Sequence, residues 1–185
     1  MRASPAILGT VGVVCLVLVQ FLPWATWGEP NGGFGMKAYT WELEMDFSGL
    51  AAFFGGGGDG SGDGSANWYS EDLDHDDGGT SSDVTMVRFA IPALLGAMLL
   101  ATIGAAMAFA TKKRAGPALV VAAGGSAAVG TILFASGLHG IFDGDPAWQP
   151  SFYLAIAASV LLLAGGIVGL VTGPPDPTAV ARARS

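Results

Sequence analysis

The sequence predicts an all-α membrane protein, a four-transmembrane-helix bundle with a small antiparallel β-sheet in a long first extracellular loop. Composition is the first reason: of 185 residues, 51% are hydrophobic and 12% are charged, against about 25% charged in a typical soluble domain. The second reason is length, because a bilayer crossing needs about 20 apolar residues. Apolar runs of about that length occupy residues 6–22, 86–110, 117–138 and 150–172.

The distribution of charge is the third reason, and it also predicts the orientation. Lys112, Lys113 and Arg114 lie in the short turn 111–116, and short basic loops stay in the cytoplasm. Both termini, including the tail 173–185, are then cytoplasmic, and the protein is a multi-pass protein of the cell membrane. The chain has a net charge of −7, and its few basic residues form no surface for phosphates, which argues against nucleic acid as a partner.

The first segment, residues 1–22, is interpreted as transmembrane helix 1 with a short cytoplasmic N-terminus. A cleaved signal peptide is the competing interpretation, but residues 21–27 lack the small-x-small pair of a cleavage site. Trp24 and Trp27 follow at once, and Arg88 lies at the outer end of the second run. Because indoles and long basic side chains prefer the headgroup level, we expect these three residues to be interfacial anchors.

The loop 23–85 holds twelve of the 15 acidic residues and contains one strand signal. Apolar and polar side chains alternate across residues 37–47, which predicts a half-buried β-strand that needs pairing partners. Segments considered as partners are 33–36, 67–70 and 84–87. The expected interaction surface consists of Tyr39, Trp41, Glu42, Glu44 and Asp46. The alternative is that the carboxylates only form the wet face of that strand.

The Gly/Asp-rich segment 55–83 is predicted to be flexible, because it has too little apolar surface to offset its ordering entropy. Within it, Asp59, Ser61 and Asp63 resemble the opening of a calcium-binding loop. The twelfth position of such a loop is Ser70 and not an acid, so a solvated linker is the competing interpretation. Calcium is the one cofactor considered, and otherwise none is expected.

The third and fourth runs are rich in small residues that let helix backbones approach closely. The predicted packing positions are Gly124, Gly125, Gly130, Gly165 and Gly169. A short extracellular turn, 139–149, joins these two runs. The runs carry no Asp, Glu, Lys, Arg or His apart from Arg88 at an end, whereas membrane enzymes and proton-coupled transporters place such groups inside the bundle. We therefore expect a protein without enzymatic activity.

Several of these features together resemble the claudin and peripheral myelin protein superfamily of four-span proteins. The features are Trp24 and Trp27 after the first span, Gly49-Leu50 in the loop, Arg88 at the second span, Gly124-Gly125 in the third, and residues 152–158 before Gly165-Gly166 in the fourth. The family's paired loop cysteines have no counterpart, because Cys15 is the only cysteine. The resemblance implies adhesion, a barrier or ion pathway, or service as an accessory subunit. Its partners would be the lipid bilayer and other membrane proteins or a second copy. The alternative is a cation-binding or cation-conducting protein that uses the acidic loop.

Overall fold

The structure, a computed structural model, describes residues 5–28, 35–46, 63–69, 81–110, 114–141 and 146–172. The elements follow in the order α1 (Pro5–Val19), β1 (Ala25–Trp27), β2 (Gly35–Ala38), β3 (Glu42–Asp46), β4 (Asp63–Asn67), α3 (Ser81–Ala110), α4 (Ala115–Ile141), β5 (Ala147–Trp148) and α5 (Pro150–Thr172). Most of these described residues are helical, as the composition predicts.

The helices differ in length. Among the described residues, α3, α4 and α5 are long and apolar enough to cross a membrane, whereas α1 is apolar but shorter. The 15 residues of α1 are about 22 Å long at 1.5 Å per residue, less than the roughly 30 Å of a hydrocarbon core. Helices α3 and α4 begin or end beyond the predicted runs 86–110 and 117–138. The apolar runs therefore leave out the first residues of α3 and both ends of α4.

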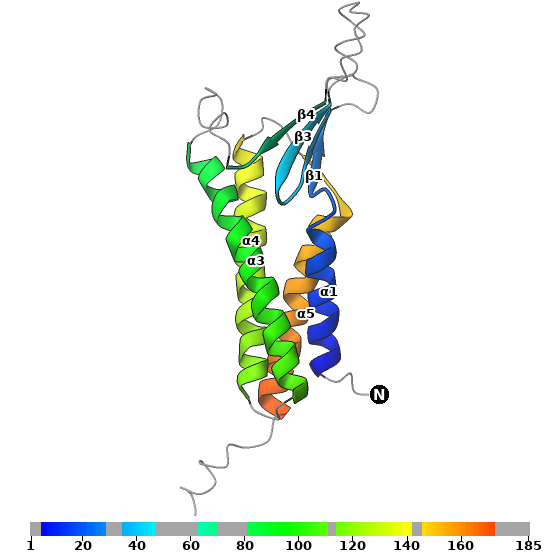
Figure 1. The fold of residues 1–185 in the computed structure, drawn as a ribbon, viewed down its shortest axis with the longest axis vertical. Helices are drawn as coiled ribbons and strands as arrows, with labels where there is room; N and C mark the ends of the chain where they lie inside the picture. The colour runs from blue at the N-terminus through cyan, green and yellow to red at the C-terminus, as the bar shows by residue number, and fades with distance from the viewer. Residues whose placement is uncertain are drawn as a thin grey trace, which may run out of the picture.

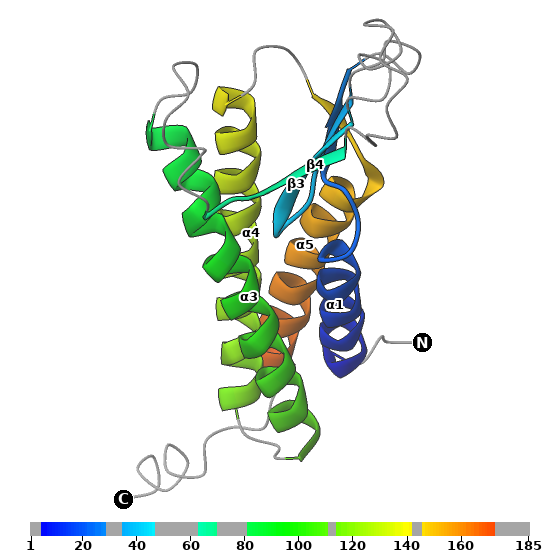
Figure 2. The ribbon, with the colours of Figure 1, turned by 45° about the horizontal axis from the view of Figure 1, so that its top comes forward.

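The four helices run side by side, and the sheet lies at one end of the bundle, above α1 and α5 (Figure 1). Helices α3 and α4 extend further in this direction, so that the first turns of α3 and the last turns of α4 flank the sheet. The α3–α4 pair and the α1–α5 pair diverge toward the sheet end and converge at the other end (Figure 2). A side-chain hydrogen bond joins α3 and α4: the Ser126 hydroxyl of α4 donates to the Ala93 carbonyl of α3 at 2.9 Å.

The predicted small antiparallel sheet is confirmed, with five strands in the order β4-β3-β2-β1-β5. Strand β5 comes from the predicted turn 139–149, in which α4 continues to Ile141. Strand β4 falls within the segment 55–83, which was predicted to be flexible. The prediction was wrong there because β4 pairs through its backbone with β3, which requires no apolar side chains. The segment 84–87, considered as a strand, lies in α3.

The single strand predicted for residues 37–47 is wrong. Residues 35–46 form a hairpin in which β2 pairs with β3 in the register Ala38↔Leu43. The backbone N–H of Tyr39 donates to the Glu42 carbonyl at 2.9 Å and closes the turn 39–41. Alternation alone does not distinguish one long strand from two short ones, because side chains keep alternating on both sides of a tight turn. Phe47 lies outside the described residues.

Glycines allow close approach at some of the predicted packing positions and not at others. A Cβ atom on Gly124 would lie 2.8 Å from the Leu163 backbone nitrogen, and one on Gly130 would lie 2.9 Å from the Leu94 side chain. Gly165 and Gly169 are buried in α5. Gly125 was wrongly predicted, because a Cβ there would meet nothing within 4 Å. The sequence analysis missed Gly104 and Gly116, where a Cβ on either residue would lie 2.9 Å from the carbonyl oxygen of the other.

Adjacent glycines give a matched test of this packing. We expect Gly124→Ala to lower the unfolding free energy by about 1–3 kcal/mol, because the methyl group meets the α5 backbone. Gly125→Ala has open space and gains helix propensity, so its thermal midpoint should hold or rise. Thermal unfolding in detergent measures both variants, and equal losses would contradict the assigned contact.

Candidate interaction surface

The sheet has one face against the helices and one face away from them. Because side chains alternate along a strand, Ala25, Ala38 and Leu43 point to the same side, where all three are buried. Trp27, Met36 and Met45 lie on this inner face too and pack against the same core. The outer face carries Thr26, Lys37, Glu42 and Glu44. The inner face attaches the sheet, and the outer face is the candidate interaction surface.

Three tryptophan indole N–H groups donate hydrogen bonds where the hairpin meets the helices. Trp24 Nε1 donates to the Thr40 hydroxyl oxygen at 3.0 Å, and Trp68 Nε1 donates to the Tyr39 carbonyl at 3.0 Å. Trp41 Nε1 donates to the carbonyl of Gln20, just beyond the end of α1, at 3.2 Å. The turn 39–41 is therefore bonded to the residue before β1, to the segment after β4 and to the residue that follows α1.

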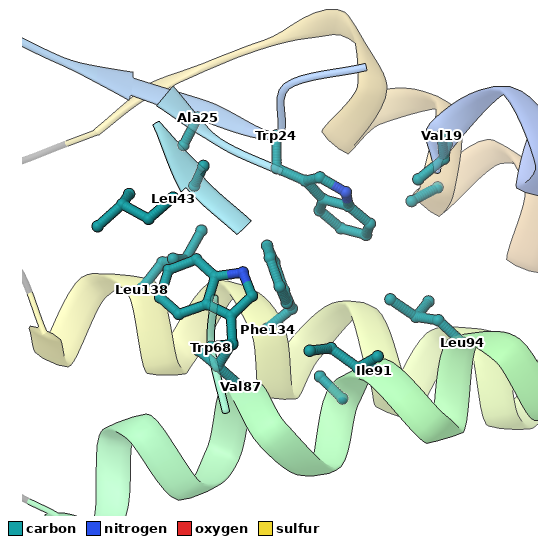
Figure 3. Close-up of a cluster of buried hydrophobic side chains, with 13 residues drawn as sticks. Val19, Trp24, Ala25, Leu43, Trp68, Val87, Ile91, Leu94, Phe134 and Leu138 are labelled. Atoms are coloured by element: carbon teal, nitrogen blue, oxygen red, sulfur yellow. The ribbon is translucent and has the colours of Figure 1, made fainter. Parts of the chain in front are cut away.

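An aromatic group fills the space between the hairpin and the helices. The rings of Trp24 and Phe134 lie 4.7 Å apart between centroids, and those of Trp68 and Phe134 lie 6.1 Å apart, edge to face. Figure 3 shows the three rings between the sheet on one side and Val87 and Ile91 of α3 on the other. All three rings are fully buried. Aromatic residues bury large areas and prefer such tilted arrangements, so this group is the main link between sheet and bundle.

The three expected interfacial anchors all make contacts within the protein. Trp24 is completely buried in the core, which does not fit the predicted interfacial position, and Trp27 is partly buried and packs on the inner face of the sheet. Arg88 Nε donates to the Trp68 carbonyl at 2.8 Å, and the Tyr69 hydroxyl donates to the Arg88 carbonyl at 3.0 Å. These bonds hold the end of β4 on α3. They satisfy backbone carbonyls, a possibility that the sequence analysis did not consider.

The start of α5 is bonded to the segment that precedes β1. The Gln149 backbone N–H donates to the Trp24 carbonyl at 2.9 Å, and its side-chain Nε2 donates to the Thr26 hydroxyl oxygen at 2.9 Å. The Ser151 hydroxyl donates to the Pro23 carbonyl. Just beyond the end of α1, the Gln20 side-chain oxygen is buried and has no hydrogen-bond partner among the residues that the structure describes. Residues distant in sequence thus meet where α1 and α5 join the sheet.

The outer face has one acid, Glu44, that contacts two neighbours. Lys37 Nζ lies 3.6 Å from Glu44 Oε2, and the Tyr39 hydroxyl donates to the same oxygen at 3.1 Å. Burial, together with the hydrogen bond and the charge of Glu44, raises the pKa of Tyr39. Glu42 is exposed nearby. Of the predicted surface residues, the acids belong to β3 while Tyr39 and Trp41 belong to the turn, so the set does not form one strand.

Two of the three calcium candidates lie outside the described residues. Asp59 and Ser61 lie outside the described residues, and Asp63 begins β4, where it is the register partner of Asp46. The described residues contain no group of three or more His, Cys, Asp or Glu side chains arranged to hold a metal ion.

Sequence reasoning missed Thr40, Trp68 and Phe134, which hold the sheet in place. The one available signal was Trp68, a large aromatic residue within a stretch of small and acidic residues. Comparison of the chain with models of known protein families and with curated proteins finds no match.

Removal of the Thr40 hydroxyl tests the hairpin attachment. Thr40→Val keeps the shape but leaves the buried Trp24 N–H without its acceptor, so we expect a loss of about 1–3 kcal/mol in unfolding free energy. Thr102→Val is the control, because the Thr102 hydroxyl is exposed and donates within its own helix to Met98. Similar thermal midpoints for the two variants would contradict a structural role for this bond.

Ionisation of Tyr39 gives a pH test. Because the pKa of Tyr39 is raised in the folded protein, its stabilising contribution is complete below about pH 10, the ordinary pKa of tyrosine. The contribution is lost as the pH rises through the folded-state pKa. We expect thermal stability above about pH 10 to fall more steeply in the wild type than in Tyr39→Phe. Glu44→Gln should show an intermediate slope, and identical slopes in all three proteins would refute this explanation.

Proposed function

We propose that this chain is a non-enzymatic, claudin-like protein of the cell membrane with four spans, whose extracellular sheet makes contacts with other proteins. Three apolar helices of spanning length support the membrane location. The shorter α1 lies beside α5 and is apolar on its exposed side, which favours a fourth crossing. The basic turn 111–116 and the acidic loop 23–85 favour cytoplasmic termini and an extracellular sheet.

This proposal rests on the difference between the two faces of the sheet: one packs on the helices and the other carries charged side chains. The inner face is used for attachment to α1, α3, α4 and α5. The outer face presents Lys37, Glu42 and Glu44. Exposed charges of this kind contribute little to stability, and a rigid sheet with a free polar face is suited to recognition.

Charge indicates the kind of partner. Loop 23–85 carries twelve of the 15 acids and only one basic residue, Lys37, whose side chain pairs with Glu44. A partner with a basic surface would be steered toward this face and away from other acidic surfaces. An adhesion protein on a neighbouring cell and a larger membrane protein that this chain accompanies are the two settings that fit.

Cation binding is the second candidate. The register of β3 with β4 makes Asp46 the partner of Asp63, and the twelve acidic residues of loop 23–85 would attract cations. This alternative predicts that calcium chelation changes the contacts made by the sheet. The protein-contact proposal predicts that chelation leaves them unchanged.

A charge reversal on the outer face tests the proposal. Glu42 is exposed and lies outside the hairpin's side-chain bonds, so Glu42→Lys should leave folding intact and reduce cross-linking to native-membrane partners at least several-fold. His139→Lys adds a positive charge on an exposed helix end and not on the sheet, and is the control.

The partners are identified by photo-cross-linking in the native membrane, with and without a calcium chelator. Retention of the same cross-linked partners by Glu42→Lys would refute the outer face as the contact surface. Loss of those partners on chelation alone would favour the cation alternative.

A further inference from the structure

Three apolar side chains form an exposed patch where α1 ends. Phe21 is 74% exposed, Leu22 is 40% exposed and Trp41 is 43% exposed. Trp41 belongs to the sheet's hairpin, and its bond to the Gln20 carbonyl places it beside Phe21. Because this bond satisfies the indole N–H, the exposed part of the ring is hydrocarbon.

The patch continues an apolar face along α1. The exposed residues on that face are Ile7, Val11, Val14, Val17 and Leu18. Exposed aromatic residues occur at the corresponding end of two other helices, with Phe89 of α3 at 65% and Tyr153 of α5 at 60%. The exposed apolar surface therefore runs along the helices and ends in aromatic residues at the sheet end.

Helix lengths give the position of a bilayer boundary. At 1.5 Å per residue, α3 from Phe89 to its end at Ala110 is about 33 Å long, close to the roughly 30 Å hydrocarbon core. Helix α1 alone is too short, but the chain from its start to Leu22 is about 27 Å long at the same rise. The α1 segment approaches the hydrocarbon thickness only if Phe21 and Leu22 are included, and α3 is long enough for a crossing that begins at Phe89.

We propose that lipid acyl chains cover Phe21, Leu22, Trp41, Phe89 and Tyr153, here termed the apolar rim. The bilayer boundary at the sheet end then passes between Trp41 and Glu42 and between Arg88 and Phe89. The turn 39–41 of the extracellular sheet lies at hydrocarbon depth, and the first two turns of α3 stand outside the membrane. This inference rests on the membrane location in the proposed function and is independent of the protein contacts.

The hydrogen bonds of the turn 39–41 fit this depth. Irregular backbone is tolerated in a membrane only where protein groups satisfy it. Here the Tyr39 N–H donates to the Glu42 carbonyl, and the Tyr39 carbonyl accepts from Trp68 Nε1. The buried Thr40 hydroxyl oxygen accepts from Trp24 Nε1. Protein groups therefore satisfy the backbone N–H and carbonyl of Tyr39 and the hydroxyl of Thr40.

Lipid fits the rim better than a second copy of the chain does. The rim includes residues of α3 and residues at the ends of α1 and α5, and these helices lie on different sides of the bundle (Figure 2). A two-fold dimer buries one patch on each copy and would leave part of this rim uncovered. Lipid surrounds the protein and covers all of it.

Cysteine accessibility in the full-length protein tests the rim. In a Cys15→Ala background, Phe21→Cys and Glu42→Cys are compared in phosphatidylcholine vesicles and in denaturant, with a membrane-impermeant maleimide added to vesicles whose sheet end faces outward. We expect Glu42→Cys to react at least tenfold faster than Phe21→Cys in vesicles and the two to react alike in denaturant. Both side chains are exposed on the protein surface, so the protein alone does not produce this difference.

Equal reaction rates in the vesicles would overturn the proposal. Protection of Phe21→Cys together with cross-linking of two copies through that residue would also overturn it, because a second copy and not lipid would then cover the rim. Neither outcome depends on Glu42→Lys, which tests the protein contacts.

Quenching of tryptophan fluorescence gives a second measurement. Phosphatidylcholine brominated near the top of its acyl chains should quench the wild type more than Trp41→Phe, and iodide in the water should quench the two proteins alike. Trp27→Phe is the control, because Trp27 packs on the inner face of the sheet and its removal should leave the lipid quenching in place. Equal lipid quenching in the wild type and Trp41→Phe would refute contact of Trp41 with acyl chains.

Discussion

The attachment of the sheet depends on one constraint: irregular backbone next to apolar helices needs internal hydrogen-bond partners. The turn 39–41 meets this constraint through indole groups. Trp24 and Trp68 each donate a bond to this turn, while Trp41 donates from it to the Gln20 carbonyl. A tryptophan can do this because a single side chain supplies both a large apolar ring and a donor. The same residues therefore bury apolar area and supply hydrogen bonds to the hairpin turn.

The shape of the bundle follows from the side chains at its two ends. Alanine, glycine and leucine dominate the core away from the sheet, where the Gly104–Gly116 pair brings α3 and α4 together. At the sheet end the core contains Trp24, Trp68 and Phe134, which need more space. The two helix pairs accordingly converge at one end and diverge at the other (Figure 2). Small residues determine how closely the helices pack, and aromatic residues create room for the hairpin.

Helices and an antiparallel sheet could be predicted from the sequence because apolar length and alternation are local properties. The attachment could not be predicted, because it depends on contacts between distant residues such as Trp24 and Thr40. Trp24 follows an apolar run and looks like an interfacial residue, but the structure buries it completely. Gly124 and Gly125 are adjacent and identical, so the sequence does not distinguish them. Their directions around α4 decide that Gly124 faces α5 and Gly125 does not. The hairpin was missed because alternation persists through its turn.

The two faces of the sheet are under different physical demands. A change at Leu43 or Ala38 alters a packed core, where one added or removed methylene is felt. A change at Glu42 alters an exposed charge, which affects stability little but changes the potential that an approaching protein meets. The fold can therefore keep its inner face while the residues of the outer face, the proposed contact surface, change. If the hairpin turn lies at hydrocarbon depth, the membrane also fixes the height and tilt of this outer face, which reduces the entropy lost when a partner binds.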